Sequence, residues 1–197
     1  QMGISGFKIS SMDITNLPLI RLVAKKNKPI IISTGMANLG DIENAINICL
    51  ENNNPNIAIL HCVSSYPCGI EFSNLSRIKR IKDSFGVITG YSDHTKEYFT
   101  PSLSLAMGAR VIEKHVTLDK GMDGPDHNFS LEPLEMKKMV ELIRQSEKAI
   151  SNHPMEKSTA ELLSKQNLKR SIYASMNLGA GDIATAETLI IKSPGDG

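Results

Sequence analysis

The sequence lacks an excess of charge of either sign, because 22 lysines and arginines nearly balance 21 aspartates and glutamates. No net field would therefore draw in nucleic acid or an anionic membrane surface. A long hydrophobic run is also missing, since stretches such as Pro29–Ile32 and Ile57–Leu60 fall far short of the roughly 20 residues that span a bilayer. No signal-peptide pattern is present. We expect a soluble protein whose partners include neither nucleic acid nor membrane, and which holds any anionic ligand with local groups.

Cysteine is scarce, with only Cys49, Cys62 and Cys68. Three is an odd number, and the spacings match no zinc motif, so a disulfide framework is not expected. Free thiols are most simply kept in a reducing compartment. We therefore predict a cytoplasmic protein with buried or half-buried thiols.

The remaining composition is that of an ordinary globular chain. Of its 197 residues 41% are hydrophobic and 22% are charged, close to the average for folded domains. This length accommodates one ordinary domain and a small one. The chain begins at Gln1, one residue from what already reads as the interior of a fold, so we expect a fragment.

Short apolar runs rich in β-branched residues alternate with helical patterns at a step of about 25 residues, which is typical of repeated βα units. Parallel βα repeats build either a doubly wound sheet or a (β/α)8 barrel, and five units are present. The expected strands are Phe7–Ser10, Pro29–Ser33, Ile57–Cys62, Val87–Tyr91 and Val111–His115. The expected helices are Leu17–Lys26, Asp41–Glu51, Leu75–Phe85, Thr100–Met107 and Glu132–Ile150.

Helix starts carry the expected signals. Asn16 precedes Leu17 and Pro18, which places an N-cap residue before a proline in the first turn. Asn38 leads into the second helix, and Pro133 opens the long one.

The character of the chain changes after Ile150. We expect residues 1–150 to form the βα domain and residues 151–166 to be a linker that includes a helical turn as an option. Residues 167–197 should begin a small β-rich domain that is truncated. Its strands are predicted at Leu168–Ala174 and Ile183–Ile191, joined by the glycine turn of residues 177–182.

Polar residues follow every expected strand, and the carboxyl ends of parallel strands open onto one shared site. These ends comprise Ser10–Ser11, Ser33–Gly35, His61–Cys62 with Ser64–Tyr66, Ser92–His94 and Lys114–His115. Hydroxyls, a glycine and imidazoles on one face would suit an oxyanion and a metal ion.

His94 and His115 would end consecutive strands, about 4.8 Å apart, so both imidazoles could bind one ion. Taken alone, two such histidines are more often unrelated polar residues than metal ligands. Lys8 could likewise snorkel from a strand edge or offer a charge to a phosphate or carboxylate. Asp126 is either a turn residue or a carboxylate that accepts substrate hydroxyls.

Several long motifs in the correct order resemble those of the bacterial sialic-acid (N-acetylneuraminate) synthases. The similarity runs from Phe7 to the end of the chain. The motifs are Lys8–Asn16, Ile32–Met36, Leu60–Cys62 followed by Ser65–Pro67, Gly90–Thr95, Glu113–Asp119 and Gly124–His127.

The resemblance implies a (β/α)8 TIM-type barrel, of which about the last five βα units are present, followed by the start of an antifreeze-like (SAF) domain. It also implies a homodimer. The implied reaction condenses phosphoenolpyruvate with an N-acyl hexosamine resembling N-acetylmannosamine, giving a nonulosonic (sialic) acid and phosphate through C–O cleavage.

Site residues carry over by position. The resemblance implies that His94 and His115 bind a divalent metal, Mn²⁺ in the first instance with Mg²⁺ or Co²⁺ as alternatives, and that they act with Asp126 in catalysis. Tyr66 and Asp126 would contact the sugar. Phosphoenolpyruvate would be held by Lys8, Ser11, Ser33 and Ser92.

Two departures from the family pattern bear on function. The first barrel strands, which carry a glutamate and a lysine near the substrates in this family, are absent from the sequence, so the chain alone should be inactive and should expose the edge at Phe7–Ser10. Ser193 stands where many neuraminate synthases have an arginine. A legionaminate- or pseudaminate-type synthase, another 3-deoxy-ulosonate synthase and a non-catalytic remnant therefore stay open as alternatives.

Overall fold

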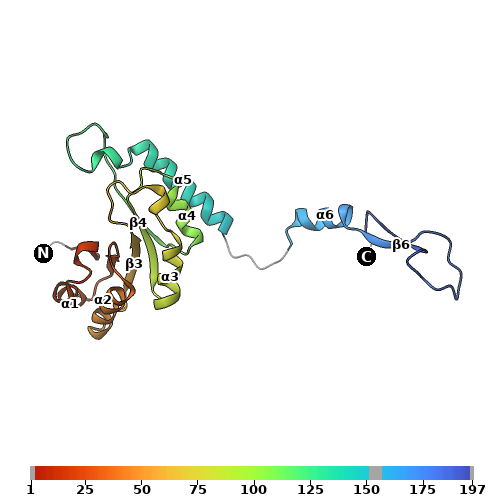
Figure 1. Cartoon of the computed structure of the whole chain (residues 1–197), viewed down its shortest axis with the longest axis horizontal. Coiled ribbons are helices and arrows are strands. Elements are labelled where there is room, and N and C mark those ends of the chain that lie inside the picture. The colour runs from red at the N-terminus through yellow and green to blue at the C-terminus, as the bar shows by residue number, and fades with distance from the viewer. Residues whose placement is uncertain (1–2, 151–156, 196–197) are drawn as a thin grey trace. The chain divides into compact units, whose positions relative to one another are not determined.

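The computed structural model describes residues 3–150 and 157–195 (Figure 1). The chain divides into two compact units, residues 1–151 and residues 152–197. No helix among the described residues is both long enough and apolar enough to cross a membrane. Each unit is described separately below.

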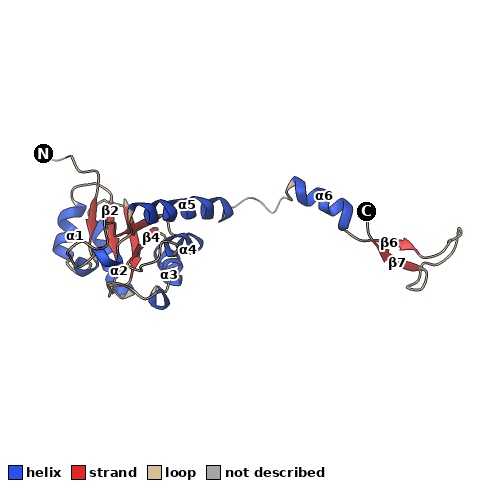
Figure 2. Cartoon of the chain, turned by 90° about the horizontal axis from the view of Figure 1, so that it is seen from above, coloured by secondary structure: helices blue, strands red, loops and turns tan. Residues whose placement is uncertain are grey.

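The first unit is built on a sheet of five parallel strands in the sequential order β1-β2-β3-β4-β5. The strands are β1 (Phe7–Ile9), β2 (Ile30–Ser33), β3 (Ile57–Cys62), β4 (Ile88–Asp93) and β5 (Val111–Lys114). The helices are α1 (Leu17–Ala24), α2 (Leu39–Glu51), α3 (Ser76–Phe85), α4 (Thr100–Ala106) and α5 (Pro133–Ile150) (Figures 1 and 2). The predicted βα repeat is confirmed, and the element bounds differ from the expected ones by three residues or fewer.

The main core lies between the sheet and its helices. Ile30, Ile32 and Ile59 project from neighbouring strands and are fully buried. They pack with buried residues of α1 and α2 such as Ile20 and Ala45. Burial of an isoleucine side chain contributes about 1.5–3 kcal/mol. The isoleucine-rich strands are thus anchored on their helix-covered face.

The opposite face of the sheet is concave. Lys8 on β1 and Glu113 on β5 belong to the two edge strands, yet Lys8 Nζ lies 3.3 Å from Glu113 Oε2. Four strand spacings of about 4.8 Å would separate the edges of a flat sheet by roughly 19 Å. Side chains alone do not span that distance, so the ion pair requires a curled sheet. The first unit is therefore a parallel half-barrel.

Local side-chain caps account for two of the predicted helix starts. The Asn16 side chain accepts a hydrogen bond from the Leu19 amide at the start of α1. Asn38 and Asp41 form a reciprocal capping box at the start of α2, each side chain accepting from the other's backbone amide. Both predictions are confirmed, because a short polar side chain satisfies a helix end wherever the chain can turn.

The second unit holds α6 (Thr159–Leu168) and an antiparallel pair, β6 (Ser171–Ala174) and β7 (Leu189–Lys192). The helical turn that was considered before residue 167 is a longer helix, which extends two residues beyond the predicted end of the linker. A capping box between Ser158 and Glu161 starts a ten-residue helix that contains neither glycine nor proline. Residues 151–156 of the predicted linker lie outside the described residues.

Both strands of this pair are shorter than predicted. The first begins at Ser171 instead of Leu168, because Leu168 ends α6. The second begins at Leu189 instead of Ile183. Thr185 and Thr188 form a local turn in which the Thr185 amide donates to Thr188 Oγ1 at 2.8 Å, and this turn takes the backbone groups that a longer strand would use.

Candidate active site

The concave face of the half-barrel collects the polar side chains that were predicted to bind an anion. Ser92 and Glu113 are cross-strand partners on β4 and β5, and Ser92 Oγ donates to Glu113 Oε1 at 2.8 Å. The other oxygen of this carboxylate pairs with Lys8. Lys8 and Ser92, predicted to share a ligand, therefore meet on one acidic side chain.

Glu113 was not singled out from the sequence, although it lies within a quoted motif. Side chains alternate along a strand, so residues two apart share a face. Glu113 precedes the predicted metal ligand His115 by two positions, and that spacing was a usable signal. What the spacing could not supply is the contact with Lys8, which depends on the curl of the sheet.

Serine hydroxyls occur at the carboxyl ends of β1, β2 and β3, and those of Ser11 and Ser64 meet beside Gly35. Ser11 Oγ accepts a hydrogen bond from the Gly35 amide at 2.9 Å. Ser64 Oγ lies so near Gly35 that a Cβ built there would be 2.0 Å from it. Within the described part of the chain, the buried hydroxyls of Ser33 and Ser64 have no hydrogen-bond partner. Buried hydroxyls without partners are costly, so these two are suited to a ligand that brings acceptor oxygens.

His94 and His115 come together as the strand spacing suggested, with ring centroids 5.2 Å apart. His94 Nδ1 lies 2.9 Å from the carbonyl oxygen of Val63. A carbonyl oxygen only accepts, so Nδ1 carries a proton, and in the neutral ring Nε2 keeps a free lone pair. The hydrogen bond to the Val63 carbonyl orients the His94 imidazole in the way that outer partners orient metal-bound histidines.

The predicted sugar contacts border the two imidazoles. The Tyr66 ring centroid lies 4.2 Å from that of His94 and 6.2 Å from that of His115. Asp126 Oδ2 is 3.7 Å from His115 Nδ1. Phe129, which was not predicted, packs 5.1 Å from the His115 ring and is buried. The structure thus brings the two histidines, Tyr66 and Asp126 together beside the apolar ring of Phe129.

The pKa values of the two imidazoles are shifted in opposite directions. Burial opposes protonation of His94, but hydrogen bonds with Cys62 and the Val63 carbonyl outweigh it and raise its pKa. Burial, together with the nearby His94 charge, lowers the pKa of His115. His115 is therefore neutral at physiological pH, the form in which imidazole is a ligand.

The residues present fit a divalent metal that takes two nitrogen ligands from the protein, one each from His94 and His115. Among the described residues, no cluster of three or more histidine, cysteine, aspartate or glutamate side chains could hold a metal ion. Two imidazoles leave most coordination positions to water or substrate oxygens, which is the open arrangement of a catalytic site.

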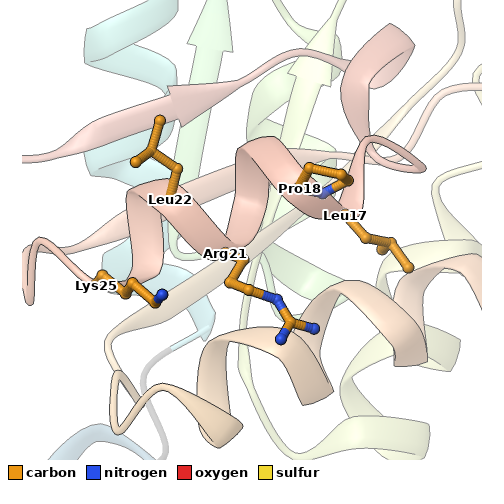
Figure 3. Close-up of a pocket in the computed structure, with 5 residues that line it drawn as sticks. All are labelled: Leu17, Pro18, Arg21, Leu22 and Lys25. Carbon is orange, nitrogen blue, oxygen red and sulfur yellow. The ribbon is translucent and has the colours of Figure 1, made fainter.

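Two depressions lie elsewhere on the first unit. One of about 460 Å³ runs along α1, and Figure 3 shows its labelled lining residues, which come from that helix and from Lys25 directly after it. The other, of about 370 Å³, is bordered by the start of α2 and by Arg77 and Arg80 of α3. Neither is lined by Lys8, Ser92, His94 or His115, whereas Thr34 and His61, which were expected at the shared site, line the second depression.

The fold and the site together define a parallel α/β protein whose polar side chains converge at the carboxyl ends of the strands, the arrangement in which barrel enzymes bind substrates. Residues 1–155 match the NeuB family. The chain belongs to the NeuB family.

Named relatives are similar over most or all of this chain. The N,N'-diacetyllegionaminic acid synthase of Campylobacter jejuni is 43% identical over 199 residues, which is 100% of this chain and 60% of the relative. The pseudaminic acid synthase of the same species is 37% identical over 97% of this chain and 55% of the relative. This chain thus spans 55–60% of the length of these curated relatives.

A solved structure shows the same architecture. The N-acetylneuraminic acid synthetase of Leptospira borgpetersenii, crystallised with citrate, superposes with a TM-score of 0.78 at 36% identity. The match covers 82% of this chain and 56% of that one.

Proposed function

We propose that this chain forms most of the catalytic part of a nonulosonate synthase, which condenses phosphoenolpyruvate with an N-acyl hexosamine and releases phosphate. The observation that carries the proposal is the convergence of two imidazoles, Tyr66 and Asp126 next to a lysine–serine cluster on one concave face. The substrate class is supported by relatives that are named as synthases of legionaminic and pseudaminic acids.

The proposed product is a legionaminic- or pseudaminic-type acid, with N-acetylneuraminate as the alternative. Support comes from the higher identity to the legionaminic acid synthase, 43%, compared with 33% to the N-acetylneuraminate-9-phosphate synthase of the mouse. Ser193, where an arginine was expected for neuraminate, donates to the Leu168 carbonyl within the second unit.

The site residues divide between the two substrates. Lys8 and Ser92, which now contact Glu113, would instead bind the phosphate or carboxylate of phosphoenolpyruvate. The hydroxyls of Ser11, Ser33 and Ser64 would complete the anion site, here called the anion cradle. Asp126 would accept sugar hydroxyls, while Tyr66 packs against the sugar. His94 and His115 would hold a divalent metal, proposed to be Mn²⁺, which when bound acts as a Lewis acid on the aldehyde of the open-chain sugar.

In the proposed reaction the enol carbon of phosphoenolpyruvate forms a carbon–carbon bond with the aldehyde carbon, and the aldehyde oxygen takes up a proton to become a hydroxyl. Water adds to the adjoining cationic carbon and loses a proton. Phosphate then leaves with cleavage of its C–O bond, while the added hydroxyl gives up its proton and becomes the ketone of the product. Orientation of the two substrates on rigid strand ends supplies several kcal/mol of the catalysis.

The wider molecule is part of the proposal. The five βα units would complete a TIM-type barrel with strands that precede this sequence, and the second unit would begin an antifreeze-like domain. We further propose a cytoplasmic homodimer, as the family resemblance implies.

The test is phosphate release by the complete gene product with phosphoenolpyruvate, Mn²⁺ and a panel of N-acyl hexosamines, to which arabinose and erythrose phosphates are added. We expect release that requires both the metal and one hexosamine. His115→Ala should lower kcat/KM by about 10³-fold, since a lost Lewis acid forfeits several kcal/mol.

Two results would contradict the proposal. Turnover of only the pentose or tetrose phosphate would assign a different 3-deoxy-ulosonate synthase. A folded protein that binds Mn²⁺ but releases no phosphate with any sugar would indicate a non-catalytic remnant.

A further inference from the structure

A buried ion pair lies directly beneath the two candidate metal ligands. Asp93 and Lys114 are the last residues of β4 and β5 and are cross-strand partners. Lys114 Nζ lies 2.8 Å from Asp93 Oδ2, and the two side chains are 1% and 0% exposed. Each is followed by a histidine, His94 after Asp93 and His115 after Lys114. Alternation along the strand places the pair on the helix side and the imidazoles on the site side.

The contacts of this pair enclose the backbone of His94. Lys114 Nζ donates both to the Asp93 carboxylate and to the Thr95 carbonyl, the residues on either side of His94. Asp93 Oδ1 in turn accepts from the Thr95 amide at 2.8 Å and from the Tyr91 hydroxyl at 3.0 Å. One ammonium group, attached next to His115, therefore fixes the chain on both sides of His94.

Stability does not explain such a pair. Removing two charges from water costs several kcal/mol for each ion, and a well-packed apolar pair of the same volume is often as stable or more stable. What the pair adds over an apolar one is directional bonding, which specifies where the ends of β4 and β5 lie relative to one another.

We propose that Lys114 and Asp93 are positioning residues that set the separation and orientation of His94 and His115, and thereby the affinity of the site for a divalent metal. This inference rests on the metal site of the proposed function. It assigns the ion pair a role in ligand geometry and none in contact with substrate.

The experiment replaces the pair as a unit in the complete gene product. Asp93→Leu/Lys114→Met removes both charges and keeps side chains of similar volume. The control is Lys120→Met/Glu135→Gln, which removes a different ion pair of the first unit. In that pair Lys120 Nζ and Glu135 Oε2 are 2.6 Å apart and the side chains are about one-third exposed. Mn²⁺ affinity is measured by titration calorimetry, the number of bound imidazole nitrogens by pulsed electron paramagnetic resonance, and folding by circular dichroism.

We expect the Asp93/Lys114 variant to fold, to bind Mn²⁺ about 10–100-fold more weakly, as for lost outer partners of metal ligands, and to show fewer than two coordinated imidazoles. The control should bind as wild type does. A folded variant with wild-type affinity and two bound imidazoles would overturn the inference while leaving the metal site intact. Failure of the wild-type protein to bind Mn²⁺ would instead overturn both this inference and the proposed metal.

A second variant serves if the first does not fold. Lys114→Gln keeps two N–H donors on a shorter, neutral side chain, so it can reach either Asp93 or Thr95 but not both in the present geometry. We expect Mn²⁺ affinity between those of wild type and the expected double variant, with altered imidazole couplings. Unchanged affinity and couplings would overturn the inference.

Discussion

At the scale of single residues, two serines behave unlike the rest of the buried polar groups. The hydroxyls of Ser33 and Ser64 are enclosed without a partner in the described part of the chain. A buried hydroxyl of this kind costs about 1–3 kcal/mol. Ser104, by contrast, is fully buried but donates to the Pro101 carbonyl at 2.6 Å.

We predict that Ser33→Ala leaves the melting temperature unchanged or raises it, because no hydrogen bond is lost. When phosphoenolpyruvate is added, the melting temperature of this variant should rise less than that of wild type, because one hydroxyl of the anion cradle is missing. Thermal melts of the complete protein, with and without the ligand, measure both effects.

Ser104→Ala is the control. It should lower the melting temperature by about 2–4 °C, the effect of roughly 1 kcal/mol in a chain of this size, and keep the full ligand shift. If Ser33→Ala resembled Ser104→Ala in both respects, Ser33 would be an ordinary structural serine.

At the scale of elements, β4 depends on a residue without a side chain. A Cβ at Gly90 would lie 2.3 Å from the Val111 carbonyl oxygen and 2.5 Å from Leu60 Cδ2. Leu60 is fully buried, and the carbonyl belongs to the neighbouring strand. A side chain at this position would therefore collide with both neighbouring strands.

We predict that Gly90→Ala destabilises the protein by about 1–3 kcal/mol through overpacking. Urea unfolding measures the change, and Gly3→Ala is the control because a Cβ at Gly3 would meet no atom within 4 Å. Equal unfolding midpoints for the two variants would show that β4 and β5 move apart at little cost.

At the scale of the molecule, the two units differ in how much they bury. The first has an isoleucine-rich core with many fully buried side chains. No side chain among residues 157–195 is buried. A two-stranded sheet without a covered face is only marginally stable in water.

We predict that amides of α6, β6 and β7 exchange with solvent deuterium at least about 10²-fold faster than those of β2 to β4, because opening costs little without a core. Hydrogen exchange followed by mass spectrometry of this chain measures the difference. Protection equal to that of the first unit would mean that the second unit acquires a covering surface in solution.

Much of the first unit could be predicted from the sequence because its signals are local. Apolar runs at a regular step indicated parallel βα units, and short polar residues before Leu17 and Leu39 indicated helix starts. The proximity of His94 and His115 followed from strand spacing alone. The extent of α6 was missed because its capping box occurs in a polar stretch without an apolar periodicity.

The sequence by itself determined the order of the elements, the edge at which the site lies and the family. Only the tertiary structure decided that Glu113 joins Lys8 to Ser92, that two serine hydroxyls are left without partners, and that Lys114 fixes the chain on both sides of His94. The physical reason is that strand period and helix caps act over a few residues, whereas these contacts join residues 19 to 105 positions apart. Such contacts exist only once the sheet has curled and strand register is set.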